Sequence, residues 1–295
     1  MEFIKKHCKE FNLEKMAEIL DVGRSSYYEF INRQPSNRTL ENKYLIEEIK
    51  KIHRESRQTY GSPRVHAKLK ILGENCSRGR VARLMQKEHL QAKMRKKWKK
   101  TTQHGKNIKT IAPNYLDQKF KVEAPNTVWA SDITYVFTQE GWLYVSVVLD
   151  LFSRKVIGLS MSNRLQTTIV VQSLKQALCH RSPEGELMHH SDRGCQYTSE
   201  EFREIAMKEN IKLSMSAKGH CYDNAVLESF FHTLKTEHVY LSQFRTREEA
   251  INSIFEYVEV FYNRKRIHST LGYLSPLEFE NVWTEKEKKK CILSV

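Results

Sequence analysis

The stretch from residue 126 to residue 162 constrains the fold more than any other part of the chain. It holds three segments rich in β-branched and aromatic residues: NTVWASDITYVF, WLYVSVVLDLF and KVIGLSMS. Such segments are typical of β-strands, and the turn at Glu140-Gly141 predicts that the strands form an antiparallel meander. Alternating helical and strand patterns follow up to residue 216. The order predicts an α/β fold, a mixed five-stranded sheet with helices on both faces.

An aspartate, Asp132, interrupts the first of these strands. An unpaired carboxylate buried in an apolar strand would be costly in free energy. Something must compensate it, and a metal ion is one candidate. The alternative is a partly exposed aspartate on the solvent side of the sheet.

Two further acids, Asp192 and Glu228, follow with 35 residues between them. Asp192 comes after an apolar strand, at the carboxyl end where open α/β sheets present their ligands. Glu228 lies beside the apolar stripe of a predicted helix, with Asp223 and Asn224 expected at its cap and first turn. The members of the stripe are Leu227, Phe230, Phe231 and Leu234.

Carboxylate oxygens from separate elements are the ligands that Mg²⁺ prefers. Two such ions can activate the attacking oxygen and stabilise the leaving oxygen in a displacement at phosphorus. Asp132, Asp192 and Glu228 therefore predict metal-dependent phosphoryl transfer on DNA. Lys235, two turns beyond Glu228, is expected to neutralise a nearby phosphate.

The positive charge of the chain is confined to its N-terminal part. The net charge is +14; residues 1–112 hold 27 Lys/Arg against 12 Asp/Glu, whereas residues 113–295 hold 22 against 23. A basic front and a near-neutral back indicate a front that binds a polyanion. The composition also predicts a domain boundary near residue 112.

Two helical modules are predicted in this front. Residues 13–32 contain two short helical patterns around Gly23, typical of a helix-turn-helix whose second helix offers residues 24–27 to DNA; a merely structural helical hairpin is the alternative. In the second module, Ser62 is expected to cap one helix and Ser77 another. The helix after Ser77 has a basic face, for which a solvated surface is the alternative to DNA binding. That face consists of Arg80, Arg83 and Lys87.

Two further basic segments are candidates for DNA contacts. Residues 91–109 hold eight Lys/Arg, including Lys96 and Lys97, and no acid, so we expect an extended DNA-tracking linker, with a solubilising tether as the alternative. Arg264 and Arg266 follow an amphipathic helix and either complement its C-terminus or contact a DNA backbone. The terminal TEKEKKKC is expected to be a solvated tail.

The six cysteines are scattered without the spacing of a zinc site, which predicts free thiols and no structural zinc. No apolar run is long enough to suggest a membrane span, and the first residues lack the apolar region of a signal peptide. We expect a soluble, cytoplasmic, nucleoid-associated protein without a membrane partner.

The acid motifs resemble a known family. Asp132 in WASDITYV, Asp192 in HSDRGCQY and Glu228 in GHCYDNAVLESFFHTLK are similar to the DDE triad of retroviral-integrase-type transposases, including the 35-residue spacing and the basic residue seven positions after the glutamate. The GHCYDNAVLESFFHTLKTE and YNRKRIHSTLGYLSPLEFE segments resemble the OrfB-type product of bacterial insertion sequence family three. The similarity covers about residues 40 to 282.

This resemblance implies a ribonuclease-H-like fold and a DNA transposase. The three acids would bind two Mg²⁺ or Mn²⁺ ions, Lys235 would contact the transposon end, and residues 216–222 would be the mobile loop before the catalytic helix. The enzyme would nick an element end to free a 3′-OH, which then attacks DNA. Its implied partners are double-stranded DNA (transposon ends and target), further copies of the chain, and an upstream-frame product.

The expected organisation has five parts. They are a helix-turn-helix module (1–36), a second helical DNA-binding module (37–90), a basic linker (91–118), a ribonuclease-H-like catalytic core (119–240) and a C-terminal helical extension with a tail (241–295). Two other functions stay open at this point, a DNA-binding regulator with an inactive core and a hydrolytic nuclease of the same fold.

Overall fold

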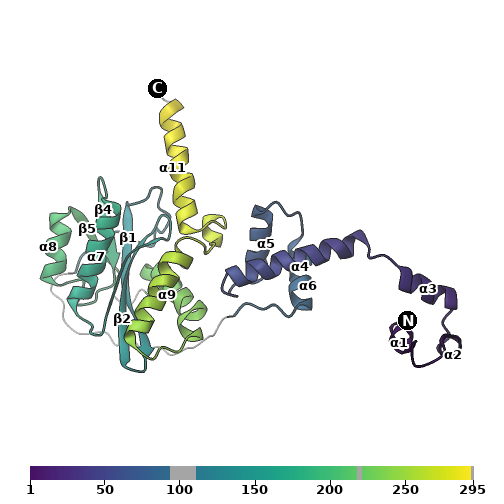
Figure 1. The fold of residues 1–295 in the computed structure, drawn as a ribbon. Coiled ribbons are helices and arrows are strands. Elements are labelled where there is room, and N and C mark those ends of the chain that lie inside the picture. The colour runs from purple at the N-terminus through teal and green to yellow at the C-terminus, as the bar shows by residue number, and fades with distance from the viewer. Residues whose placement is uncertain (94–110, 218–220, 294–295) are drawn as a thin grey trace.

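The computed structural model of the chain describes residues 1–93, 111–217 and 221–293. Helices at the N-terminus are followed by a sheet with helices, and a helical extension completes the chain (Figure 1). The basic residues Lys96 and Lys97 lie outside the described residues, as does most of the predicted linker. In the described part, no helix is long and apolar enough to cross a membrane.

Three short helices form the first unit: α1 (Glu2–His7), α2 (Leu13–Ile19) and α3 (Arg24–Asn32). The side chain of Asn12 caps α2 by accepting a hydrogen bond from the backbone N–H of Glu14 at 2.8 Å. Tyr27 is buried against Ile4 and Met16. The prediction that α3 offers Tyr27 to DNA is therefore wrong, because this side chain holds the three helices together.

The second helical unit consists of α4 (Asn37–Glu55), α5 (Ser62–Ile71) and α6 (Arg78–Lys87). Ser77 caps α6 as predicted, accepting a hydrogen bond from the backbone N–H of Arg80. Ser62 is not a cap: it is the first residue of α5, and Gly61 takes the cap position.

The sheet has five strands in the order β3-β2-β1-β4-β5. Their bounds are β1 (Val128–Thr138), β2 (Gly141–Asp150), β3 (Val156–Ser162), β4 (Leu187–Ser191) and β5 (Ile211–Met215). The first three are antiparallel neighbours, which confirms the meander, and β4 and β5 add on in parallel. This is the predicted mixed sheet of the ribonuclease-H-like fold.

Helices cover both faces of the sheet, as predicted (Figure 1). On one face, α7 (Thr167–Arg181) and α8 (Glu200–Lys208) share a core with Trp129 and Val148. On the other, α9 (Ala225–Glu237) and α10 (Arg247–Glu256) share a core with the alternate strand residues. The alternation along each strand thus fixes which residues face α7 and which face α9.

Short helical turns and one long helix complete the chain. The turns are η1 (Cys221–Asn224), η2 (Val239–Leu241), η3 (Tyr257–Tyr262) and η4 (Ser269–Leu271). The expected tail is largely exposed, as predicted, but it is helical: it belongs to α11 (Pro276–Leu293). Ser275 and Glu278 form a reciprocal capping box at its start, a strong signal for helix initiation.

The second helical unit docks on the end of α9 and on the C-terminal extension. The backbone N–H of Ile267 donates to the hydroxyl of Tyr60 at 2.8 Å, and Arg64 donates to Glu237 at 3.2 Å. Arg266 donates twice to the same Glu237, at 2.8 and 2.7 Å, and is 3% exposed. The predicted DNA contact by Arg266 is therefore wrong, because its guanidinium is buried in an ion pair with Glu237.

Candidate active site

Strand pairing places Asp132 beside Asp192. Ser131 of β1 pairs with Ser191 of β4 in parallel register, so the next residue of each chain segment is one of the two aspartates. Residues in register on parallel strands are neighbours. The structure therefore brings together two acids that lie 60 positions apart in the chain.

Asp132 is half-buried, and its carboxylate accepts a hydrogen bond from the backbone N–H of Ile133 at 2.7 Å. Burial and then the charge of Asp192 raise the pKa of Asp132 to about 8, with a further contribution from Glu228. Lys235 acts in the opposite direction. The three acids and the lysine thus share one electrostatic environment.

Asp192 sits in a tight turn at the end of β4. Its carboxylate accepts a hydrogen bond from the backbone N–H of Gly194 at 2.9 Å. A Cβ on Gly194 would lie 2.9 Å from the same carboxylate oxygen, so a side chain here would displace the carboxylate of Asp192. Arg193 donates to the carbonyl of Ser216 at 2.7 Å and ties this turn to the end of β5.

Glu228 is exposed on α9, while the predicted stripe beside it is buried. Packing of the stripe fixes the rotation of the helix and so the direction of Glu228. Lys235, two turns later, places its ammonium 5.0 Å from the centre of the Tyr135 ring. His232 is exposed on the same helix.

The three acids form an all-oxygen donor set that fits a divalent cation. Like charges that raise the pKa of a half-buried aspartate are the kind of arrangement that a cation relieves. Among the described residues, however, no group of three or more His, Cys, Asp or Glu side chains is close enough to hold a metal as it stands. The three acids interact electrostatically, but their side chains do not surround a single metal position.

Two buried histidines lie directly beneath Asp192. Nε2 of His189 is 2.6 Å from the hydroxyl of Ser131, and His190 lies between the hydroxyls of Ser214 and Ser216 at 3.0 and 3.2 Å. Burial lowers the pKa of His189 to about 3 and that of His190 to about 4, so both are neutral at pH 7. Sequence reasoning gave them no role, although two histidines in an apolar strand just before the acid were a signal.

The start of α9 is held differently from the prediction. Asn224 takes the cap position, but its side chain makes no capping hydrogen bond. The carboxylate of Asp223, 3% exposed, instead accepts from the backbone N–H of Ala217 at 2.8 Å and from the amides of Asn114 and Gln118 at 2.9 and 3.1 Å. Asp223 therefore ties the start of α9 to the last residues of the predicted linker.

The predicted DNA-contacting residues of the second unit divide into two groups. Arg83 and Lys87 are exposed on α6. Arg80 instead donates to Glu41 and Asn42 of α4, both at 2.9 Å. The outer face of α6 thus offers two of its three predicted basic residues.

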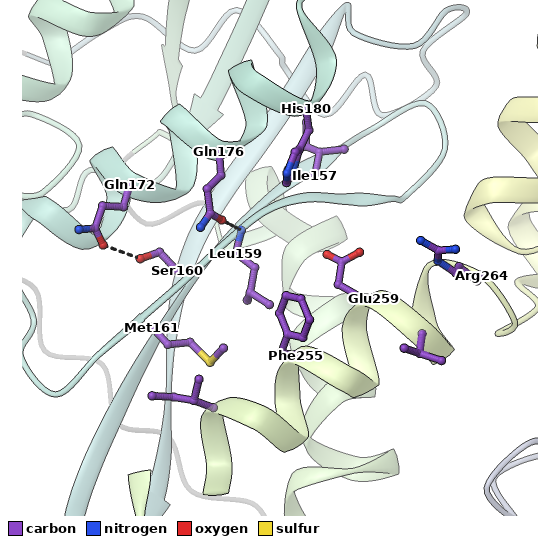
Figure 2. A pocket seen from close by; sticks show the side chains of 12 residues that line it. Ile157, Leu159, Ser160, Met161, Gln172, Gln176, His180, Phe255, Glu259 and Arg264 are labelled. Atoms are coloured by element: carbon purple, nitrogen blue, oxygen red, sulfur yellow. Dashed lines mark hydrogen bonds between the residues drawn. The ribbon is translucent and has the colours of Figure 1, made fainter. Parts of the chain in front are cut away.

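Arg264 is exposed and lines a groove between β3, α7 and the continuous α10–η3 helix (Figure 2). Side chains of α7 cover the edge of β3 here: Gln176 accepts from the backbone N–H of Leu159 at 3.1 Å, and His180 lies 3.1 Å from the carbonyl of Ile157. None of the three acids lines this groove. It is separate from the candidate active site.

Comparison with family models gives three matches along the chain. An HTH-like domain matches residues 39–98, and models described as integrase core domain match residues 122–221 and 228–282. Two similar relatives are the "Insertion element IS600 uncharacterized 31 kDa protein" of Shigella sonnei and the "Transposase InsF for insertion sequence IS3A" of Escherichia coli (strain K12). The first is 42% identical over 90% of this chain and 97% of the relative; the second is 39% identical over 95% and 97%.

Solved retroviral integrase structures are also similar. The HTLV-2 integrase catalytic core domain in complex with magnesium (trimeric form) is 18% identical, with a TM-score of 0.42, over 53% of this chain and 97% of that one. The simian T-cell lymphotropic virus intasome in complex with PP2A regulatory subunit B56 gamma is 16% identical, with a TM-score of 0.45, over 79% and 74%.

Proposed function

The chain belongs to the family of integrase-core transposases that includes the transposase of insertion sequence IS3 and whose members are polynucleotidyl transferases acting on DNA, and we propose that Asp132, Asp192 and Glu228 carry its chemistry. The observation that supports this assignment is the register of β1 and β4, which makes the two aspartates neighbours. Glu228 adds to the field at Asp132 from a helix that is anchored by its buried stripe.

We infer that the three carboxylates hold two Mg²⁺ or Mn²⁺ ions. When bound, the ions would activate the attacking oxygen and stabilise the leaving oxygen. Around them, the chain's own groups set the geometry: Gly194 and Arg193 fix the turn that carries Asp192, and the α9 stripe aims Glu228. Lys235 would neutralise a phosphate of the element end next to the acids.

The reaction we propose is nicking at an element end followed by attack of the freed 3′-OH on DNA. The exposed residues of α6, Arg83 and Lys87, and the basic segment 91–118 would bring the end to the acids. In this organisation, 1–36 and 37–90 are DNA-binding modules, 119–240 is the catalytic core, and 241–295 is the extension on which the second module docks.

We further propose that several copies of the chain assemble on double-stranded DNA. The DNA partners would be the transposon ends and the target. A product of the upstream reading frame is expected to take part as a fusion or partner. We expect the protein to act in the bacterial cytoplasm at the nucleoid.

The test of the acid assignment is Glu228→Gln, with His232→Gln as the matched control on the same helix. The first should abolish nicking and joining of end-containing DNA, since removing one member of a unit costs most of its activity, and the second should keep both. Joined products distinguish the transposase from a hydrolytic nuclease. If Glu228→Gln nicks and joins like the unaltered protein, the assignment fails.

A further inference from the structure

Three aromatic side chains stand exposed together on the β1–β2 hairpin. Tyr135, Phe137 and Trp142 are 36%, 64% and 46% exposed. Phe137 and Trp142 are register partners, and the Trp142 ring meets the rings of Tyr135 and Phe137 edge-on at 5.1 and 5.3 Å. The exposed parts of the Phe137 and Trp142 rings offer an aromatic surface to a further planar group.

The hairpin that carries these rings is clamped. Arg247, at the start of α10, donates to the carbonyl of Glu140 at 2.7 Å and to that of Trp142 at 3.0 Å. Gly141 between them has φ +114°, and a Cβ there would lie 2.8 Å from the same guanidinium. An exposed surface built on a fixed backbone is preorganised, which reduces the entropy cost of binding.

The aromatic surface lies next to the proposed catalytic acids. In the described residues, pairing between β1 and β4 ends at Ser131, so β1 continues past Asp132 without that neighbour. Tyr135 is three residues further, about 10 Å along a strand, and by the alternation of β1 its side chain points to the opposite face from that of Asp132. Lys235 links the two, because the charge of Asp132 acts on its ammonium. Lys235 is seven residues beyond Glu228, also about 10 Å along a helix. The 5.0 Å contact of Lys235 with the Tyr135 ring joins the two paths.

A nucleotide fits this combination of groups. Bases stack on aromatic side chains, and an ammonium beside the rings suits the phosphate. An apolar protein surface in the same place would have to cover the charged ammonium of Lys235 with apolar side chains, which is unfavourable. A distance of about 10 Å corresponds to roughly three nucleotides at ~3.4 Å each along one strand. Bases in an intact duplex already stack on each other, so the base that binds must be unpaired.

We propose that Tyr135, Phe137 and Trp142 form a stacking site for an unpaired base of the element end, within about three nucleotides of the reacting phosphate. This inference rests on the proposed function of the acids. The stacking site would recognise a DNA end whose base pair has opened, whereas Lys235 would contact the backbone.

The experiment combines Trp142→Ala with abasic sites placed singly at each of the first four or so nucleotides on either side of the nick. The DNA is a duplex of the element's own end, and both binding without divalent metal and joining are measured. Loss of one stacked base should weaken binding by roughly 5- to 150-fold. At the position whose base stacks on Trp142, the abasic site should weaken DNA binding by the unaltered protein to the level of Trp142→Ala. The same abasic site should not weaken binding by Trp142→Ala any further.

Trp142→Phe should keep most of the binding because it preserves a ring, and Phe255→Ala, which removes a ring exposed to a similar degree, 56%, should change nothing. The inference would be overturned if Trp142→Ala and the abasic site weakened DNA binding additively at every position. It would also be overturned if Trp142→Ala bound DNA as tightly as the unaltered protein. A change of oligomeric state of Trp142→Ala or Trp142→Phe without DNA would overturn it too, because the surface would then join two copies of the chain. Activity that survives Glu228→Gln would instead remove the proposed function itself.

Discussion

At the scale of single residues, two glycines allow close contacts that have different consequences. A Cβ on Gly194 would meet the carboxylate of Asp192, whereas a Cβ on Gly158 would lie 2.1 Å from the backbone carbonyl of Ser173, where β3 meets α7. The first close approach lies at a proposed catalytic acid, and the second allows a helix to pack on the sheet. Both restrictions come from contacts that the sequence alone does not display.

Gly194→Ala should therefore impair activity, and Gly158→Ala should impair stability. Displacing Asp192 by a few tenths of an ångström or more should lower joining by about 10- to 100-fold while the melting temperature stays nearly unchanged. Overpacking at Gly158 should lower the free energy of unfolding by roughly 1 to 3 kcal/mol. Denaturant unfolding and a joining assay on both variants check the pair; a reversed pattern would show that these contacts are misassigned.

At the scale of elements, α9, which carries Glu228, is held at two places. Its buried stripe packs on the sheet, and Asp223 fastens its start to residues 114–118. The stripe was predictable because helical periodicity shows in a single segment. The contacts of Asp223 were not, because Asn114 and Gln118 lie 109 and 105 positions away, and only tertiary packing brings them together.

Asp223→Ala should remove three hydrogen bonds and loosen the start of α9. We expect joining to fall by about tenfold or more, since Glu228 follows one turn later, with helix content by circular dichroism unchanged. Gln118→Ala removes one of the three bonds and should have a smaller effect. Equal activity of Asp223→Ala and the unaltered protein would contradict a positioning role.

At the scale of the whole molecule, the second helical unit contacts both the end of α9 and the C-terminal extension. Tyr60, Arg64 and Arg266 all converge on the region around Glu237 and Ile267. From the sequence, Arg264 and Arg266 looked alike as members of one basic cluster. Their difference, one exposed and one buried, depends on a partner 29 residues from Arg266.

Glu237→Gln should test this junction through pH. Although burial opposes it, the hydrogen bonds from Arg266 and Arg64 lower the pKa of Glu237 below 4.5. The contribution of the carboxylate is therefore fully present above pH 4.5 and is lost as pH falls through the lower folded pKa. Glu237→Gln should cost roughly 3 to 5 kcal/mol at pH 7 and flatten the loss of stability below pH 4.5.

The matched control is Glu256→Gln, which breaks the exposed pair with Arg57 and should cost about 1 kcal/mol or less. Denaturant unfolding at several values between about pH 3 and 7, where carboxylates titrate, compares the stability of the two variants. Equal losses in both variants would mean that the buried ion pair does not hold the junction.

The central claim is that Asp132, Asp192 and Glu228 act together as one divalent-metal site. Direct measurement of Mn²⁺ binding to the protein on its end DNA tests it, comparing Asp132→Asn with Glu140→Gln, an exposed acid on the same hairpin. We expect Asp132→Asn to weaken Mn²⁺ binding by roughly tenfold or more, as for a lost ligand, and to abolish joining, while Glu140→Gln changes neither. Unchanged Mn²⁺ binding and joining in Asp132→Asn would contradict it.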